Sequence, residues 1–481
     1  MRFISADNAA SSWDTIIVGS GFGSLFFLQK HLQKRPNDRI LLLEWGDHKT
    51  IAEQRNARQN SEIKSGSTFI NDGGKEWSFT IGLGGGTNCW WALSPRLHPS
   101  DFQINAKYGV NVDWPISYEE LAPYYLEAED TMNMAGPNDI AAVYPGADQY
   151  PLPPHKLSTV DRILKDANPD KHFAIPCARL SRARDNRGRC CSTGTCNLCP
   201  TGAKFYALNS MEETLSNRNV SICTRAKVEY LEHSGNTIEK VRYSHDGKEF
   251  TATADLVVLG ANAIFNPFIM LRSGIEGAGL GRYLGEKIYA YAEARLDGIK
   301  HFDGGTFTTG LNTTLLDGPH RSKHGGAAIL IENGFERFGL RSDPKRWREL
   351  LPIGLYIEDI FQETNGIFDD GGDKPIVRFK GFSDYSLNGL KETVRQLPEI
   401  LSALPIEEIE FKTIHPTIAH LQGTTRFGDD PSTSVLDANQ LHHKIRNLVV
   451  VGTSVFPTTG SANVSVTAAA MSLRAADKIL S

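Results

Sequence analysis

The 481-residue chain has no uninterrupted apolar run that could cross a membrane. Its longest apolar stretch, residues 256–271, is interrupted by one Gly, two Asn and one Pro, and it falls short of the ~20 apolar residues that a spanning helix needs. The first residues, MRFISADNAASSWD, lack the apolar core of a signal peptide. We therefore expect a cytoplasmic protein without a membrane span of its own. The alternative is a periplasmic protein, exported together with a partner that carries the signal.

Basic residues are not in excess, and cysteine is scarce. Lys and Arg number 51 against 56 Asp and Glu, which gives a net charge of −5. This balance argues against non-specific nucleic-acid binding as the main role. Only seven cysteines are present, and four of them lie within residues 190–199. Scattered disulfides would not produce such clustering, so the pattern indicates a local redox or metal-binding loop.

The N-terminal region has the pattern of a β-α-β unit. Residues 14–19, DTIIVG, predict a buried strand, residues 24–33 predict a helix, and RILLLE, ending at Glu44, predicts a second strand. The first turn is GSGFGS, with Gly19, Gly21 and Gly23, and such a turn lets backbone N–H groups approach a pyrophosphate. Glu44 follows this motif by 44 − 24 = 20 residues, where a carboxylate can bind a ribose diol. Dinucleotide binding is predicted; the alternative is a tight structural turn.

The rest of the chain divides into regions of different character. A helix is predicted over residues 118–132, and strands are predicted within residues 225–260. Residues 151–189 look irregular, and residues 290–425 look rich in strands and turns. The tail predicts a buried strand at residues 447–452 and a closing helix from about Ser465 to Leu480.

The tail, together with the glycine turn, resembles the glucose–methanol–choline (GMC) oxidoreductase family of FAD enzymes. The resemblance rests on six segments: NLVVVGTSVFP and GSAN at 447–457 and 460–463, GLGGGT at 82–87 followed by RLHPSDF at 96–102, LVVLGANA at 256–263, and HLQGT at 420–424. It implies an α/β fold with a discontinuous, Rossmann-like FAD-binding domain and a substrate domain whose antiparallel sheet is flanked by helices. The FAD-binding domain is expected at 1–105, 200–290 and 425–481, and the substrate domain at 106–199 and 291–424, with the cysteine loop at 190–199.

The resemblance also implies site residues. The expected FAD-binding residues are Gly19, Gly21, Gly23, Glu44, Gly85, Gly86, Asn88, Val228, Thr453 and Asn463. His420 is the expected base for the substrate hydroxyl and Asn463 its partner, which hydrogen-bonds the substrate oxygen. A histidine suits this chemistry because its pKa lies near neutrality. A helix that begins near Asn463 would direct its positive end at the flavin and stabilise negative charge there.

Two positions depart from the family pattern. Val464 follows Asn463 where the family often has proline. Cys89 stands where some members have a histidine bonded covalently to the flavin, so histidyl attachment is excluded. A cysteinyl thioether stays open, and a buried thiol beside non-covalent FAD is the preferred interpretation.

The cysteine loop resembles that of bacterial FAD-dependent glucose dehydrogenases and related sugar dehydrogenases. Those enzymes bind a three-iron, four-sulfur cluster through three cysteines. Here the ligands would be Cys190 or Cys191, Cys196 and Cys199, although the last spacing is one residue shorter. Structural thiols or a disulfide, and zinc, are the alternatives. Five nearby arginines either offset thiolate charge, dock an acidic acceptor, or form a solvated loop.

The resemblance implies an FAD-dependent dehydrogenase that oxidises an alcohol group of a sugar, glycoside or polyol. Electrons would leave through the cluster to an acceptor such as a cytochrome, and a small accessory subunit is a possible partner. Trp77, Trp90, Trp91 and Trp114 are candidate platforms for a sugar ring, or core residues. The alternatives are an oxygen-using alcohol oxidase without a cluster, a flavin-containing lyase, and a flavin-binding subunit without catalysis.

Overall fold

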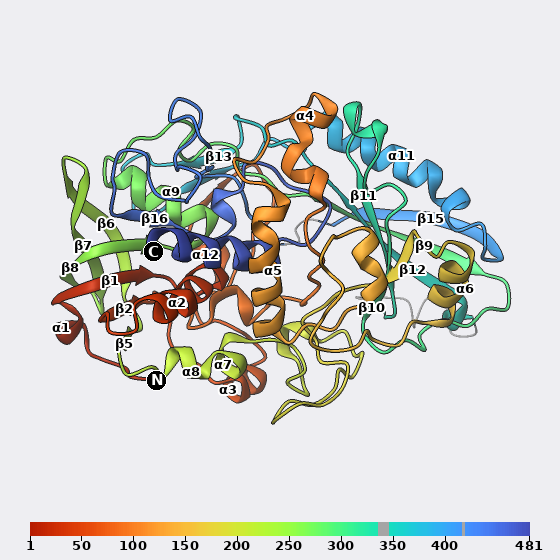
Figure 1. Ribbon diagram of the computed structural model, residues 1–481, viewed down its shortest axis with the longest axis horizontal. Helices are drawn as coiled ribbons and strands as arrows, with labels where there is room; N and C mark the ends of the chain where they lie inside the picture. The colour runs from red at the N-terminus through yellow and green to blue at the C-terminus, as the bar shows by residue number, and fades with distance from the viewer. Residues whose placement is uncertain (335–345, 416–418) are drawn as a thin grey trace.

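The computed structural model describes residues 1–334, 346–415 and 419–481. Two large β-sheets organise this part of the chain. In Figure 1 the seven-stranded sheet lies at the left and the six-stranded sheet at the right, with helix α5 (Tyr118–Met132) in front of the region between them. None of the described helices is both long enough and apolar enough to cross a bilayer.

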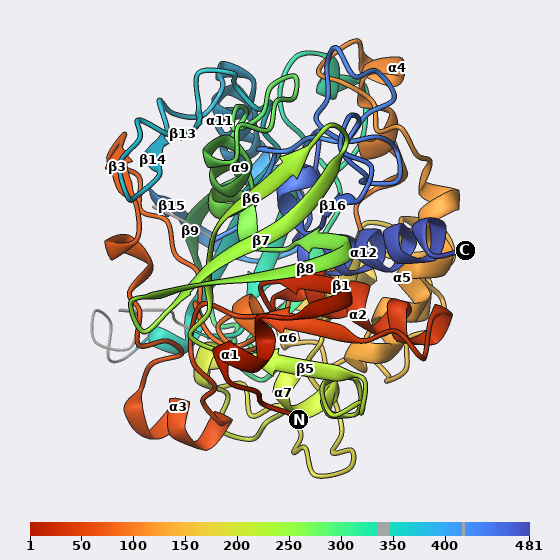
Figure 2. The same ribbon diagram turned by 90° about the vertical axis from the view of Figure 1, so that its left-hand side faces the viewer.

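The seven-stranded sheet has the order β5-β2-β1-β8-β7-β6, and β16 also pairs with β8 (Figure 2). Its strands are β1 (Ser12–Val18), β2 (Ile40–Leu43), β5 (Val220–Cys223), β6 (Lys227–Ser234), β7 (Thr237–His245), β8 (Lys248–Leu259) and β16 (Leu448–Val450). Strands β5, β2, β1, β8 and β16 pair in parallel, and β6 to β8 form an antiparallel meander. Segments more than 400 residues apart therefore meet beside β8.

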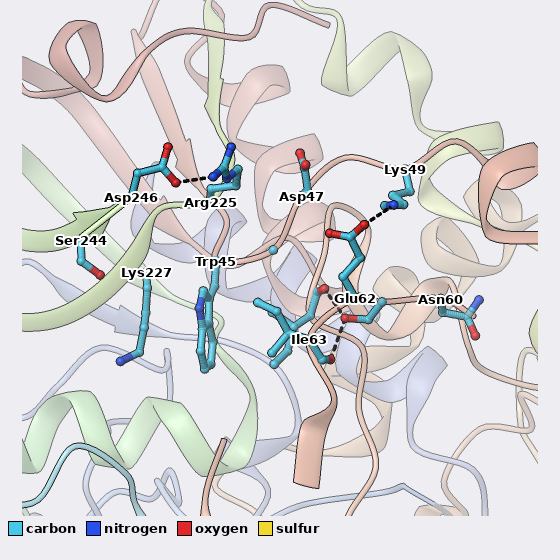
Figure 3. Close-up of a pocket in the computed structure, with 13 residues that line it drawn as sticks. Trp45, Asp47, Lys49, Asn60, Glu62, Ile63, Arg225, Lys227, Ser244 and Asp246 are labelled. Atoms are coloured by element: carbon cyan, nitrogen blue, oxygen red, sulfur yellow. Dashed lines mark hydrogen bonds and ion pairs between the residues drawn. The ribbon is translucent and has the colours of Figure 1, made fainter. Parts of the chain in front are cut away.

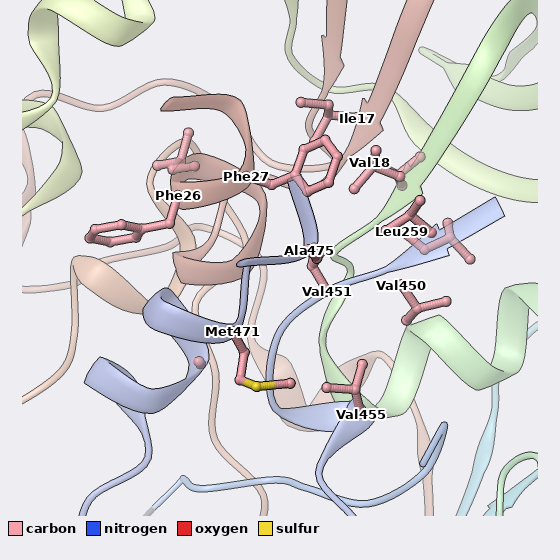
Figure 4. Packing of buried hydrophobic residues seen from close by; sticks show 14 of the residues in the cluster. Ile17, Val18, Phe26, Phe27, Leu259, Val450, Val451, Val455, Met471 and Ala475 are labelled. Carbon is pink, nitrogen blue, oxygen red and sulfur yellow. The ribbon is translucent and has the colours of Figure 1, made fainter. Parts of the chain in front are cut away.

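Helices α2 (Phe22–Lys34) and α12 (Ser465–Ile479) pack on the centre of this sheet. Figure 4 shows Phe27 of α2 and Ala475 of α12 beside Ile17, Leu259 and Val451. All these side chains belong to one buried apolar cluster. The second half of strand β1 ends in the apolar run Ile16–Val18, which is buried because helices and neighbouring strands cover it.

The six-stranded sheet is antiparallel, with the order β15-β9-β12-β11-β10-β4. Its strands are β4 (His172–Ala174), β9 (Ile288–Leu296), β10 (Thr308–Asn312), β11 (Ala327–Glu332), β12 (Leu350–Ile357) and β15 (Ile406–Ile414). Alternate residues of the central strands face opposite sides. Leu355 of β12 packs with Leu397 of helix α11 (Asp384–Ile400), whereas Tyr356 belongs to a second cluster on the other face. One face is thus covered by a helix, and the other is left for the site.

The remaining described elements are shorter. The helices are α1 (Ala6–Ala9), α3 (Ile51–Ala57), α4 (Ile104–Tyr108), α6 (Thr159–Ala167), α7 (Ala207–Ser210), α8 (Glu212–Leu215) and α9 (Asn262–Arg272). Strands β13 (Gly366–Phe368), β14 (Ile376–Arg378) and β3 (Ile70–Asp72) form a small third sheet.

The α/β fold with a Rossmann-like part and an antiparallel sheet is as expected. Residues 290–425 are rich in strands, as predicted, but they also contain the 17-residue helix α11; the prediction that residues 151–189 are irregular was wrong, because they contain α6 and β4. The signal for α11 was present: Leu387, Leu390, Val394 and Leu397 recur at helical spacing after the N-cap Ser383. The domain boundaries remain a prediction; the strand β9, which begins at Ile288, crosses the one placed after residue 290.

Candidate active site

One cavity of about 690 Å³ extends from the glycine turn to the face of the antiparallel sheet that α11 does not cover. Its walls include ten of the residues expected from the sequence: Gly19, Gly21, Gly23, Glu44, Gly85, Gly86, Val228, His420, Thr453 and Asn463. These residues come from both ends and the middle of the chain. The fold thus brings the dinucleotide motif and the expected catalytic residues to a single site.

The glycine turn depends on close backbone contacts. Gly19 has φ +83°, a left-handed conformation that disfavours other residues. Gly23 lies in the first turn of α2, where a Cβ would come within 2.6 Å of the backbone nitrogen of Gly452. By contrast, a Cβ on Gly21 would meet no protein atom within 4 Å. Gly23 therefore sets the approach of α2 to the C-terminal segment, and Gly21 leaves open space above the turn.

These two glycines allow a matched test. Gly23→Ala is expected to lower the free energy of unfolding by about 1–3 kcal/mol through overpacking, and to weaken FAD binding by roughly 5- to 150-fold. Gly21→Ala is expected to leave the stability of the FAD-free protein unchanged and to weaken only FAD binding. Thermal denaturation of the FAD-free protein and fluorescence titration with FAD measure the two effects. Equal stability of the two FAD-free variants would contradict this account.

Glu44 is a buried carboxylate at the end of β2. Its Oε2 accepts hydrogen bonds from the backbone nitrogen and hydroxyl of Ser20, at 3.1 and 2.5 Å, and Oε1 accepts one from Gly46 N at 2.9 Å. Burial raises the pKa of Glu44, and these hydrogen bonds partly oppose that shift. Glu44 therefore holds the glycine turn in place and also lines the cavity. This is the position expected of an acid that binds a ribose.

A polar pocket of about 480 Å³ adjoins the cavity at this end (Figure 3). Trp45, Asn60, Ile81 and Lys227 line both spaces. Most of its charged side chains are paired with one another or with neighbours: Lys49 with Glu62, Arg225 with Asp246, and Lys227 with Glu229. We interpret the pocket as the outer mouth of the nucleotide end of the cavity.

The Gly-rich loop forms another wall, in the 3₁₀ turn Gly85–Thr87. The expected cofactor residue Asn88 does not line the cavity. Its Nδ2 donates to Leu83 O at 2.9 Å, so it shapes the loop from behind. The thiol of Cys89 lines the cavity, next to Trp90.

Asn463 and the start of α12 close the cavity at its deep end. Asn463 is 6% exposed, and its Oδ1 has no hydrogen-bond partner among the described residues. Ser465 and Ala468 in the first turn of α12 also line the cavity, so backbone N–H groups and the positive end of the helix dipole lie at this wall. Thr453 donates its hydroxyl to Leu421 O at 2.5 Å and thereby ties the tail to the segment that carries His420.

His420 lines the same cavity, and its surroundings are strongly charged. Its backbone nitrogen donates to Glu286 Oε1 at 2.8 Å, and its Nδ1 lies 3.4 Å from the Nζ of Lys287. Burial and the positive charges of Lys287 and Lys75 hold the pKa of His420 well below its usual value. His420 is therefore a neutral imidazole at pH 7.

The antiparallel sheet contributes a polar, aromatic wall that sequence reasoning missed. The hydroxyl of Tyr289 donates to Glu332 Oε1 at 2.9 Å, and the rings of Tyr289 and Tyr356 meet at 5.1 Å between centroids. His415 also lines the cavity. Tyr289 and Tyr356 are directly opposite on β9 and β12. The alternation of side chains along these strands could have indicated which residues share a face of the sheet. It does not show which distant strands pair with each other.

The four tryptophans divide between two roles. Trp90 and Trp91 line the cavity. Trp77 is buried against Phe379, and the indole of Trp114 donates to Thr458 Oγ1 at 2.7 Å within the core. His442 and His443 do not line the cavity and are held by Glu276 O and Ser434 Oγ.

Three of the four clustered cysteines are buried beside two cations. Cys190, Cys196 and Cys199 are at most 9% exposed, whereas Cys191 faces solvent. Arg179, fully buried, donates from Nη1 to Cys196 Sγ at 3.4 Å. Its Nε and Nη2 have no hydrogen-bond partner among the described residues.

The second cation, Lys204, connects this loop to the cavity wall. Its Nζ donates to Asn88 O at 2.7 Å and to Trp90 O at 3.1 Å. Burial lowers the pKa of Lys204 to about 7, and the thiols of Cys89, Cys196 and Cys199 oppose that shift. Across the described ranges, all seven cysteines are free thiols, and no group of three or more ligating side chains is arranged around a single metal ion.

Comparison with known sequences identifies the family. The GMC oxidoreductase N-terminal model matches residues 60–288, and the C-terminal model matches residues 343–472. The chain belongs to the GMC oxidoreductase family. GMC oxidoreductases use FAD to act on alcohol groups, so this chain is an FAD-dependent oxidoreductase of CH–OH donors.

Individual relatives of this GMC protein are distant. The fructose dehydrogenase large subunit of Gluconobacter japonicus is 27% identical, with 83% of this chain and 80% of the relative covered. The 6'''-hydroxyparomomycin C oxidase of Streptomyces lividus is 25% identical, with 98% and 91% covered. The crystal structure of pyridoxine 4-oxidase from Mesorbium loti superposes with a TM-score of 0.68 at 19% identity, over 97% of this chain and 99% of that one, and shares the fold.

The residues of the cavity fit the FAD of this family. The open space above Gly21, the acid Glu44 and the N-terminus of α12 match a pyrophosphate, a ribose and an anion-stabilising wall. The cysteine loop also fits an anionic group, because the buried guanidinium of Arg179 stays charged and faces thiols, those of Cys177 and Cys196, rather than a carboxylate among the described residues.

Proposed function

We propose that this GMC oxidoreductase is a dehydrogenase that oxidises an alcohol group of a sugar, glycoside or polyol. The observation that carries the proposal is the single cavity in which the dinucleotide turn, His420 and Asn463 face a wall rich in hydroxyls and a carboxylate. Such a wall can satisfy several substrate hydroxyls at once. The similarity to a fructose dehydrogenase subunit supports this substrate class.

His420 is the base in this mechanism. Because its imidazole is neutral, it can accept the hydroxyl proton through Nε2. FAD, when bound, would accept the hydride from the carbon that carries this hydroxyl. The side chain of Asn463, whose Oδ1 has no partner among the described residues, orients the substrate oxygen through its amide. The first turn of α12 stabilises the negative charge that develops at this end of the cavity.

Cys190, Cys196 and Cys199 are the proposed ligands of an iron–sulfur cluster of three irons and four sulfides. Their burial and the adjacent Arg179 and Lys204 support this proposal. Thiolate ligands and sulfides would provide negative charge beside Arg179 and would favour the charged form of Lys204. Electrons would leave by this route to a cytochrome, and a relative named as a large subunit favours an accessory partner.

Iron and acid-labile sulfide per FAD, measured on protein purified without air, test the cluster. We expect about three irons and about four sulfides per FAD in the wild type. Cys196→Ser is expected to lose most of the iron, and Cys191→Ser, at the solvent-exposed cysteine, to keep it. FAD without iron, or stoichiometric zinc, would overturn the cluster.

Anaerobic and aerobic turnover with a panel of sugars and polyols tests the dehydrogenase. We expect FAD to be reduced by an alcohol and reoxidised by an artificial acceptor much faster than by oxygen. The similarity to hydroxyparomomycin oxidase favours an oxygen-using oxidase as the second candidate, and hydrogen peroxide formed in step with substrate loss would select it. Turnover while FAD stays oxidised would indicate a lyase, and no turnover of any alcohol a non-catalytic subunit.

A further inference from the structure

A buried lysine lies behind the expected base. Lys287, immediately before β9, is 1% exposed, and its Nζ is 3.4 Å from Nδ1 of His420. Because Nδ1 faces Lys287, Nε2 is the ring nitrogen left for a substrate in the cavity that His420 lines. The state of Lys287 therefore decides which nitrogen of the neutral imidazole carries the proton.

The charges around Lys287 come from several elements. Among the described residues, no carboxylate forms an ion pair with Lys287. The adjacent Glu286 instead accepts from Lys75 Nζ at 2.5 Å and from the backbone nitrogen of His420. The facing groups are Glu286 on the same segment, Lys75 from the loop after β3, Asp101 from the 3₁₀ turn Pro99–Gln103, the ring of Tyr356 on β12, and His420. Burial lowers the pKa of Lys287 to about 7, against the attraction of Glu286 and Asp101.

We propose that Lys287, as a neutral amine, accepts the Nδ1 proton of His420 and thereby becomes the final acceptor of the substrate hydroxyl proton. The inference rests on the proposed role of His420 as the base. In the reaction, the substrate O–H bond breaks and an Nε2–H bond forms. The Nδ1–H bond breaks in the same relay, and Lys287 becomes an ammonium. The carbon hydride leaves with its electron pair to FAD, so protons and electrons balance without another reactant.

The opposite arrangement would disable the base. A permanently charged Lys287 would donate to Nδ1 and keep the proton of the neutral ring on Nε2, where no lone pair would remain for the hydroxyl proton. An imidazolium would also lie beside Lys75 and Lys287, which the buried site disfavours. A neutral amine at position 287 removes both difficulties.

The test measures anaerobic flavin reduction by the best alcohol of the panel, as a function of pH. In the wild type we expect the rate of flavin reduction to rise with pH through a midpoint near 7, the pKa of Lys287. Below this midpoint Lys287 is an ammonium, which must lose a proton before it can accept the one on Nδ1 of His420. Lys287→Arg is expected to slow reduction about 100-fold, without recovery at high pH, since arginine stays charged. Lys287→Met removes the amine and should shift the midpoint to the pH at which His420 titrates alone. Lys30→Met, at a lysine outside the cavity, is the control.

A second readout needs no turnover. In protein labelled with ¹⁵N-histidine, the His420 signal is assigned by its absence in His420→Ala. Above pH 8 the wild type should show the proton on Nδ1, and Lys287→Arg should show it on Nε2. A wild-type proton on Nε2, or a Lys287→Arg variant with the wild-type rate and pH profile, would overturn the inference. If His420→Ala reduces FAD normally, the base assignment itself fails; if it is slow while Lys287→Arg is normal, only this inference fails.

Discussion

Replacing His420 with alanine is expected to slow the reduction of FAD by the alcohol substrate about a thousandfold. A positioned general base contributes about 10²- to 10⁴-fold, and His420 lines the cavity that Asn463 also lines; His415 is a second imidazole in this wall. Stopped-flow absorbance under anaerobic conditions isolates this step from reoxidation. The FAD content of the variant should match the wild type, because the contacts that place the segment are made by the backbone of His420 and by Thr453.

His443→Ala is the matched control for this variant. His443 bonds to Ser434 Oγ at 2.8 Å and does not line the cavity, so its loss should leave flavin reduction unchanged. Unchanged reduction in His420→Ala would show that another group takes the hydroxyl proton. Loss of FAD from His420→Ala would show that the residue serves binding rather than proton transfer.

Replacing Arg321 with methionine is expected to lower the free energy of unfolding by about 3–5 kcal/mol. Arg321 is fully buried and donates to both carboxylate oxygens of Glu358, at 2.9 and 2.5 Å, and to Asp101 Oδ1 at 2.7 Å. It thereby connects the turn after the Gly-rich loop to the end of β12 in the antiparallel sheet. Without the guanidinium, two buried carboxylates lie unpaired, and urea denaturation would measure the loss.

The same variant should show a defined pH dependence. Removal of Arg321 takes away the positive charge that favours ionised Asp101, so the pKa of Asp101 rises further. Asp101 can then bind a proton as the pH falls, and the destabilisation should be smaller at pH 5.5 than at pH 8. Arg395→Met, at an exposed pair with Glu392, is the control and should not change the midpoint. An equally small effect for Arg321→Met would contradict the account.

The sequence determined the nucleotide-binding half because its signals are local. A β-branched run, a glycine turn, a helix and an acid at a fixed distance lie within residues 12–44, and the helix 118–132 was predicted with the bounds that the structure gives. The family, and with it FAD and the oxidation of alcohols, followed from segments that each contain a recognisable turn. His420 and Asn463 were named from the same segments, and their roles stay predictions.

Only the tertiary structure decided what surrounds the reacting atoms. Lys287 belongs to no recognisable motif. It is placed beside the expected base because the start of β9 packs next to the segment that carries His420, 133 residues away along the chain. Glu332 and Tyr356 reach the cavity because β11, β12 and β9 pair in one register, which places alternate residues on the open face. Likewise, Arg179 reaches Cys196, and Lys204 donates to two backbone carbonyl oxygens, only because the fold buries both side chains beside the cysteine loop. Sequence specifies local turns and helices, but register, burial and charge pairing arise from contacts between distant segments.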